Sequence, residues 1–337
     1  KLGKMLVRYL KSTCRDAIWR EGEPFEGASN LGLELADISV RISTICQSMG
    51  EKVAIRLKTR RRMASAQGLN SGGLESGMGQ LLELGMTSPQ VQVLQAACGA
   101  RRGLVLLSGA TGAGKTTTMY GILSGLCSQS LNIVSLEDPV EDILIGINQI
   151  DVRRGRFSEI LPNILRQDPD VIAIGELRDP ETLHMAINAA LTGHLVIGTI
   201  HGGSIGQTYK RISEMGVSQT SIEDALSLIC HQVLIPLNCP ICRHREHISG
   251  GMAKLLGIAP GQIVQKGQGC SFCQYRGTRG SISAYEIRLE ITGIDGEEAQ
   301  KSLPYQVREH LIQGKISQVE AARALGIFAG NITRLLN

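Results

Sequence analysis

The chain has 337 residues, enough for two or three domains, and its 42% hydrophobic and 20% charged content is typical of a folded globular protein. A net charge of +4 is too small to indicate a nucleic-acid partner by itself, and 3% aromatic residues leave few side chains for stacking on single strands. The sequence contains no uninterrupted apolar stretch of the ~18 residues that a membrane-spanning helix requires, and no secretory signal is visible.

Residues 1–70 are predicted to form a small α/β domain. Alternation of apolar and polar residues favours strands over residues 33–40 and 52–57. A polar, Gly-rich stretch at residues 66–79 follows and is typical of a linker, so residues 71–95 are assigned to a linker region.

From residue 103 to about residue 237, short apolar runs alternate with helical patterns. The predicted strands lie at 104–107, 132–136, 171–174 and 195–200, with helices such as 116–126 and 180–191 between them. This alternation is typical of a mostly parallel sheet covered by helices. Residues 306–336 are predicted to be helical.

The segment GATGAGKT at residues 109–116 matches the phosphate-loop pattern G-x-x-x-x-G-K-[ST] in full, between a predicted strand and a predicted helix. Its glycines let the backbone wrap a triphosphate with several N–H groups pointing inward, and the following helix offers its N-terminus to the anion. Lys115 can reach the β and γ phosphates, and the Thr116 hydroxyl can ligate Mg²⁺. The residues expected to bind ATP and Mg²⁺ are Gly109, Ala110, Thr111, Gly112, Ala113, Gly114, Lys115, Thr116 and Thr117.

Acidic residues follow two of the predicted strands. Glu137, Asp138 and Glu141 come after the first, and Glu176 comes after the second. A phosphate loop needs one acid near the metal and another that orients water. In open α/β sheets the chemistry lies at the carboxyl ends of the strands, where both groups of acids are expected. The alternative, solvated acids in strand-to-helix turns, is disfavoured by the complete phosphate loop.

Nine cysteines include two C-x-x-C pairs with 27 residues between them. Four thiolates at this spacing are typical of a closed, structural Zn²⁺ site, so no catalytic role is expected for the metal. The odd total and the paired spacing fit a reducing, cytosolic compartment better than a disulfide framework. The expected ligands are Cys239, Cys242, Cys270 and Cys273. Four unligated thiols are the alternative, and His244 and His247 are competing ligands.

Four ordered motifs resemble those of the secretion ATPase superfamily, and more narrowly those of the ATPases of type IV pilus assembly and type II secretion. The motifs are LSGATGAGKTTT, NIVSLEDPVE, LRQDPDVIAIGELRDPET and ALTGHLVIGTIH, and the resemblance covers roughly residues 38–275. It implies an α/β protein with a RecA-like P-loop NTPase core at residues 96–337. This core would include a zinc module at 236–276 and C-terminal helices at 300–337, and it would follow a partial PAS-like N-terminal domain at 1–70.

The resemblance also implies catalytic roles. Lys115 and Thr116 would bind the phosphates and Mg²⁺, and Glu141 would act as the general base that polarises the attacking water. Glu137, Asp138 and Glu176 would shape the magnesium shell, with Glu176 acting through water.

Further residues would close the site around the nucleotide. His194 and His201 would sense the γ-phosphate or link the nucleotide to domain motion. Arg41 and Arg56 of the N-terminal domain would swing onto the nucleotide, because an arginine fork neutralises phosphate charge as it develops. The alternative for these two arginines is a solvated position on their strands. Arg166 would be a further contact.

The sequence departs from the family pattern at several positions. Pro162 stands where the family often has an arginine, and Gly202 and Gly203 replace the usual Thr-Asn after His201. The acidic-His segment that opens the family's N-terminal domain is not found before Arg41. Nucleotide binding is therefore a firmer expectation than hydrolysis by this chain alone.

The resemblance leads to one functional hypothesis and three alternatives. The hypothesis is a homo-hexameric cytosolic ATPase at the inner membrane, where it would act on a platform protein and drive pilin or pseudopilin assembly. Its cofactors would be ATP, Mg²⁺ and Zn²⁺, and no nucleic-acid partner is expected. The alternatives are a conjugation-type secretion ATPase, a nucleotide-gated scaffold that does not hydrolyse ATP, and a RecA-like nucleic-acid motor.

Overall fold

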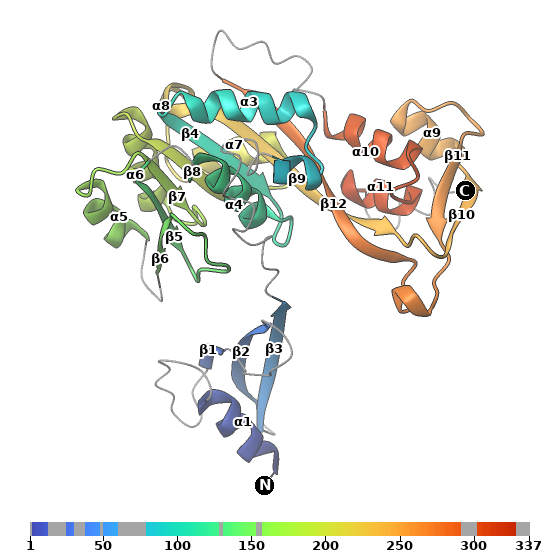
Figure 1. Cartoon of the computed structure of the whole chain (residues 1–337), viewed down its shortest axis with the longest axis horizontal. Coiled ribbons are helices and arrows are strands. Elements are labelled where there is room, and N and C mark those ends of the chain that lie inside the picture. The colour runs from blue at the N-terminus through green and yellow to red at the C-terminus, as the bar shows by residue number, and fades with distance from the viewer. Residues whose placement is uncertain are drawn as a thin grey trace. The chain divides into compact units, whose positions relative to one another are not determined.

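The computed structural model describes residues 2–12, 25–29, 38–47, 50–59, 79–127, 131–152, 157–290 and 302–327. The chain divides into two compact units (Figure 1). The first comprises residues 1–70 together with residues 141–143, and the second comprises residues 71–140 and 144–337. Among the described residues, no helix combines the length and the apolar character needed to cross a bilayer.

The described residues of the first unit form one helix and a three-stranded antiparallel sheet of order β1-β2-β3. Its elements are α1 (Leu2–Ser12), β1 (Phe25–Ser29), β2 (Ile38–Gln47) and β3 (Gly50–Thr59). The predicted strand at 52–57 falls within β3, whereas most of the one at 33–40 lies outside the described residues. An ion pair attaches the helix to the sheet, because the buried Lys11 Nζ lies 3.0 Å from Glu51 Oε1.

The second unit is built on a seven-stranded sheet of order β12-β9-β4-β8-β7-β5-β6. All neighbouring strands are parallel except β12, which runs antiparallel to β9. The bounds are β4 (Gly103–Gly109), β5 (Ile133–Glu137), β6 (Asn148–Asp151), β7 (Val171–Ile174), β8 (Leu195–His201), β9 (Leu226–Asn238) and β12 (Thr278–Leu289). The predicted parallel sheet is thus confirmed. Every residue of β4, β5 and β7 is buried, as expected for parallel strands covered on both faces.

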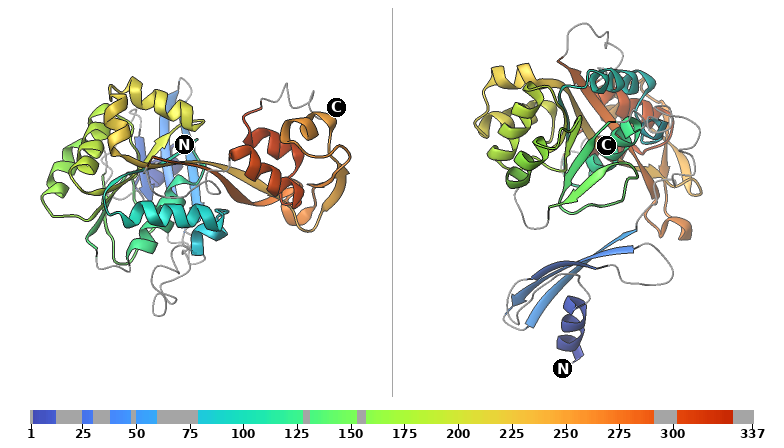
Figure 2. Two further views of the ribbon diagram at one scale, coloured as in Figure 1. Left: turned by 90° about the horizontal axis from the view of Figure 1, so that it is seen from above. Right: turned by 60° about the vertical axis from the view of Figure 1, so that its left-hand side comes forward.

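Helices cover both faces of this sheet. Leu104 and Leu106, alternate residues of β4, join one hydrophobic core with α5 (Phe157–Leu165), α6 (Pro180–Leu191), α7 (Ile205–Glu214) and α8 (Gln219–Ala225). The helices α3 (Ser88–Gly99) and α4 (Lys115–Leu126) lie on the opposite face (Figure 2). Because all the parallel strands run the same way, their carboxyl ends meet at one edge, where β4 leads into α4.

The strands β9 and β12 extend beyond the core sheet and carry a second hydrophobic core at their far ends (Figure 1). This region contains β10 (Arg243–His247), α9 (Gly250–Leu256), β11 (Ile263–Gly267) and the short 3₁₀ helix η3 (Ser271–Cys273), followed after β12 by α10 (Leu303–Ile312) and α11 (Gln318–Ala324). The two last helices fall within the predicted helical region, whose end at residues 328–337 lies outside the described part of the chain.

Candidate functional site

The segment at residues 109–116 forms the predicted strand–loop–helix. The strand β4 ends at Gly109, and α4 begins at Lys115. Gly112 and Gly114 have φ of +80° and +88°, in the left-handed region that favours glycine, so two glycines of the motif are required by the backbone conformation.

Lys115 reaches back across this loop. Its Nζ donates hydrogen bonds to the carbonyl oxygens of Gly109 at 2.8 Å and Ala110 at 3.0 Å. Burial lowers the pKa of Lys115, and the nearby Glu176 carboxylate offsets part of this effect. The ammonium group therefore lies inside the loop, where its positive charge would attract a bound phosphate.

Glu176 and Arg178 form an ion pair at the same edge of the sheet. Glu176 follows the end of β7, and its Oε2 lies 2.7 Å from Nη2 of Arg178. The hydrogen bond from Arg178 to Glu176 raises the pKa of the arginine, with a further contribution from Asp138. Glu176 thus interacts with both Lys115 and Arg178, and Asp138 lies near enough to act on Arg178; their roles at a nucleotide stay predictions. Sequence reasoning missed Arg178, whose position two residues after Glu176 was the available signal.

Glu137 is buried, with 2% of its surface exposed, at the end of β5. Its Oε1 accepts hydrogen bonds from Ser135 Oγ at 2.8 Å and Gln149 Nε2 at 3.0 Å, and its Oε2 accepts one from the Tyr120 hydroxyl. Because Tyr120 lies on α4, the carboxyl group joins the phosphate-loop helix to the neighbouring strands. These contacts indicate that Glu137 positions the loop helix, and its predicted part in the magnesium shell stays a prediction.

Tyr120→Phe is expected to lower the free energy of unfolding by about 1–3 kcal/mol, because the buried Glu137 loses one of its donors. Urea-induced unfolding of the full chain measures this change. Tyr275→Phe is the control, since Tyr275 is 79% exposed and surface changes usually stay within about 0.5 kcal/mol. Equal stability of both variants would show that the Tyr120 hydroxyl does not support Glu137.

His201 ends β8 and pairs in register with Gly109, so it lies beside the start of the loop, and its predicted role there stays a prediction. The next residue, Gly202, is tightly enclosed: a Cβ there would lie 2.3 Å from Thr208 Oγ1 and 2.9 Å from Ser108 Oγ. These two hydroxyls are 2.5 Å apart, in a buried hydrogen bond between α7 and β4. Packing therefore explains why glycine stands at position 202.

His194 lies at the opposite edge of the sheet, just before β8 begins, and its predicted role stays a prediction. Its carbonyl oxygen accepts a hydrogen bond from the N–H of Gly103, where β4 begins. The seven residues of β4 separate this point from the loop by about 20 Å. Arg166 also lies before the start of a strand, β7. Its Nη1 donates a hydrogen bond to Asn163 Oδ1 at 3.2 Å.

Three predicted catalytic residues belong to the first unit. Arg41 and Arg56 occupy paired register positions on β2 and β3, and Glu141 falls in the short segment grouped with that unit. Their roles at the nucleotide stay predictions.

The four predicted cysteine ligands converge, with all their sulfur atoms within 4.8 Å of one another. The Cys239–Cys270 and Cys242–Cys273 sulfur distances are 3.9 Å, and Cys270–Cys273 is 3.8 Å. A tetrahedron with Zn–S bonds of about 2.3 Å has sulfur–sulfur distances of about 3.8 Å. The spacing fits four ligands of one metal ion and is far longer than the ~2.0 Å of a disulfide.

The backbone around these cysteines is shaped to support thiolates. Cys273 Sγ accepts hydrogen bonds from the N–H groups of Cys270 at 3.2 Å and Gly277 at 3.3 Å, and Cys242 Sγ accepts one from Gly269 at 3.2 Å. At Gly267, a Cβ would lie 1.9 Å from the carbonyl oxygen of Gly277, so the two turns meet backbone to backbone. The donors favour charged sulfur, as zinc coordination requires.

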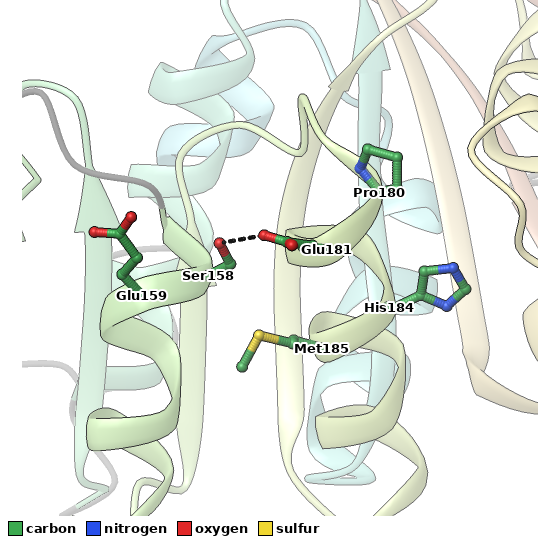
Figure 3. Close-up of a pocket in the computed structure, with 6 residues that line it drawn as sticks. All are labelled: Ser158, Glu159, Pro180, Glu181, His184 and Met185. Atoms are coloured by element: carbon green, nitrogen blue, oxygen red, sulfur yellow. Dashed lines mark hydrogen bonds between the residues drawn. The ribbon is translucent and has the colours of Figure 1, made fainter.

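An open groove of about 480 Å³ lies elsewhere, between α5 and α6 (Figure 3). Its lining residues are Ser158, Glu159, Pro180, Glu181, His184 and Met185. Ser158 Oγ donates a hydrogen bond to Glu181 Oε2 at 3.2 Å across the groove. It contains none of the predicted site residues.

The sequence is similar to proteins of bacterial secretion systems. A sequence model of the family described as "Type II/IV secretion system protein" matches residues 1–321. The Type II secretion system protein E of Klebsiella pneumoniae is 35% identical over 292 residues, which are 86% of this chain and 56% of that protein. The Type II secretion system ATPase E of Vibrio cholerae is 33% identical over 86% of this chain and 56% of its own length. The chain thus spans little more than half the length of these relatives.

Two solved structures share the fold. The pilus retraction motor PilT with bound ADP has a TM-score of 0.61 at 23% identity, covering 93% of this chain and 80% of its own. The Legionella pneumophila ATPase DotB has a TM-score of 0.57 at 18% identity, and the match covers 90% of this chain and 78% of DotB. These likenesses confirm the predicted fold class.

Proposed function

The chain belongs to the type II/IV secretion system protein family, and on this premise we propose that it binds and hydrolyses ATP. The observation that carries the proposal is the position of Lys115, whose Nζ lies inside a complete phosphate loop and interacts with the carboxylate of Glu176. The name of one relative, the Type II secretion system ATPase E of Vibrio cholerae, supports the same activity.

The residues around the loop fit a nucleotide with its metal. Lys115 offers a positive charge to the β and γ phosphates, and the α4 N-terminus offers backbone N–H groups. The Thr116 hydroxyl and the partly exposed Glu176 carboxylate are the groups that would hold Mg²⁺. When bound, this ion supplies Lewis-acid neutralisation of phosphate charge. Glu137 has its oxygens occupied by protein donors, so it would support the site indirectly.

Release of inorganic phosphate from ATP by the concentrated chain tests this proposal. Steady release with Mg²⁺ present is the expected result. ATP binding without release would favour a nucleotide-gated scaffold, and release that requires DNA would favour a nucleic-acid motor. Absence of both binding and release would overturn the proposal.

Glu141→Gln is expected to slow phosphate release by about 100-fold, because a general base that orients water contributes about 10²–10⁴ in rate. Nucleotide affinity should change little, since the loop is intact. The matched control is Glu159→Gln, at the groove between α5 and α6, which should keep full activity. Rapid hydrolysis by Glu141→Gln would move the base elsewhere, first to Glu176, because Glu137 is enclosed by its donors.

The finer proposal concerns assembly. A homo-hexamer at the cytoplasmic side of the inner membrane would act on a platform protein of a type II secretion or type IV pilus system. Family membership supports this assignment, and the tetracysteine module favours it over a conjugation-type ATPase. Particle size with and without a non-hydrolysable ATP analogue tests it: a hexamer is expected with the analogue, and a monomer under both conditions would contradict it.

The four cysteines would hold one structural Zn²⁺. Their sulfur spacing and N–H donors support this assignment. No open ligand position is needed, so the ion would stabilise the fold and take no part in hydrolysis.

A further inference from the structure

Gln232, on β9, contacts the phosphate loop at three residues. Its side-chain Nε2 donates a hydrogen bond to the carbonyl oxygen of Ala113 at 2.7 Å. Its own carbonyl oxygen lies 2.6 Å from where a Cβ on Gly109 would stand, and its Nε2 lies 3.3 Å from the Cβ position of Gly114. Gln232 is fully buried, so water does not compete for these contacts.

The hydrogen bond to Ala113 determines the direction of the next N–H group. The peptide unit between Ala113 and Gly114 is planar, and its C=O and N–H point in opposite directions. When Gln232 holds the C=O, the Gly114 N–H must point away from Gln232. Because Gly114 has φ of +88° and no side chain, this peptide unit would otherwise rotate easily.

We infer that Gln232 is a positioning residue of the nucleotide site, which fixes the Gly114 N–H toward the phosphates. This inference rests on the proposed ATP binding, because backbone N–H groups are the phosphate ligands of such loops. Sequence reasoning did not identify Gln232, which is 119 residues from its hydrogen-bond partner.

The oxygen of the Gln232 side-chain amide indicates that this residue does more than fill space in the core. Its Oε1 is buried and has no hydrogen-bond partner among the described residues. A buried polar atom without a partner costs free energy, whereas an apolar side chain of similar size would avoid this cost. The amide is therefore better explained by its contact with the loop than by its contribution to the core.

Gln232→Met tests the inference, because methionine has similar length and lacks the donor. In the full chain, binding of ATP and ADP is expected to weaken about tenfold, the loss typical of one buried hydrogen bond. In phosphate release, KM should rise with little change in kcat, since the N–H contacts phosphate in the ground state and the transition state alike. Gln232→Asn, whose amide is too short to reach Ala113, gives the same readout should the methionine variant not fold.

Gln90→Met is the matched control. Gln90 is also fully buried, and its amide donates to a backbone carbonyl, that of Tyr285 at 3.1 Å on β12. Both variants are expected to lower the melting temperature, but only the change at Gln232 should alter nucleotide affinity. Unchanged affinity in Gln232→Met, with the wild type binding normally, would overturn the inference alone. A wild type that binds neither nucleotide would instead overturn the proposed function together with it.

Discussion

Lys115→Ala is expected to reduce ATP hydrolysis about 1,000-fold, the upper part of the range for loss of one group that stabilises transition-state charge. The Lys115 ammonium lies inside the phosphate loop, held by the carbonyls of Gly109 and Ala110. Alanine removes the positive charge that would face the β and γ phosphates, so nucleotide affinity should fall as well. Phosphate release and ADP binding by the full chain measure the two effects separately.

Lys210→Ala is the control for this change. Lys210 is 76% exposed on α7, and its Nζ lies a long 3.9 Å from Glu214 Oε1, so its loss should leave hydrolysis within twofold. Phosphate release by Lys115→Ala at the wild-type rate, from a folded protein, would show that the loop is not the hydrolytic site.

Cys273→Ser is expected to abolish stoichiometric zinc binding and to unfold the region between the far ends of β9 and β12. A structural zinc site contributes about 10–16 kcal/mol in isolated zinc-finger peptides, more than a typical domain's whole stability. Cys273 is buried and its sulfur accepts two N–H groups, so serine cannot replace it. Metal analysis of the purified chain and limited proteolysis measure the loss.

Cys46→Ser provides the comparison, because Cys46 is exposed on β2 and lies outside the cluster. It should retain one zinc ion per chain and the wild-type proteolysis pattern. If the wild type contains no metal and chelator leaves its melting temperature unchanged, the four sulfurs do not form a structural zinc site.

Several elements were predictable because their signals are local. The parallel core was found from apolar runs alternating with helical patterns, and α6 has the predicted bounds of 180–191. The long β9 and β12 were not predicted as a pair. Residues 239–277, which form β10, α9, β11 and η3, separate them, and pairing across such a distance leaves no local signal in the sequence.

The sequence by itself determined the phosphate loop, the parallel fold and the four cysteines, because each is encoded by the spacing of residues close together in the chain. Only the tertiary structure decided that Glu137 is enclosed by donors, that Arg178 pairs with Glu176 and that Gln232 supports the loop. It also placed His194 at the far edge of the sheet. The physical reason is that these contacts depend on which strands are neighbours and in which direction they run, and hydrogen bonding and burial select that order over the whole chain.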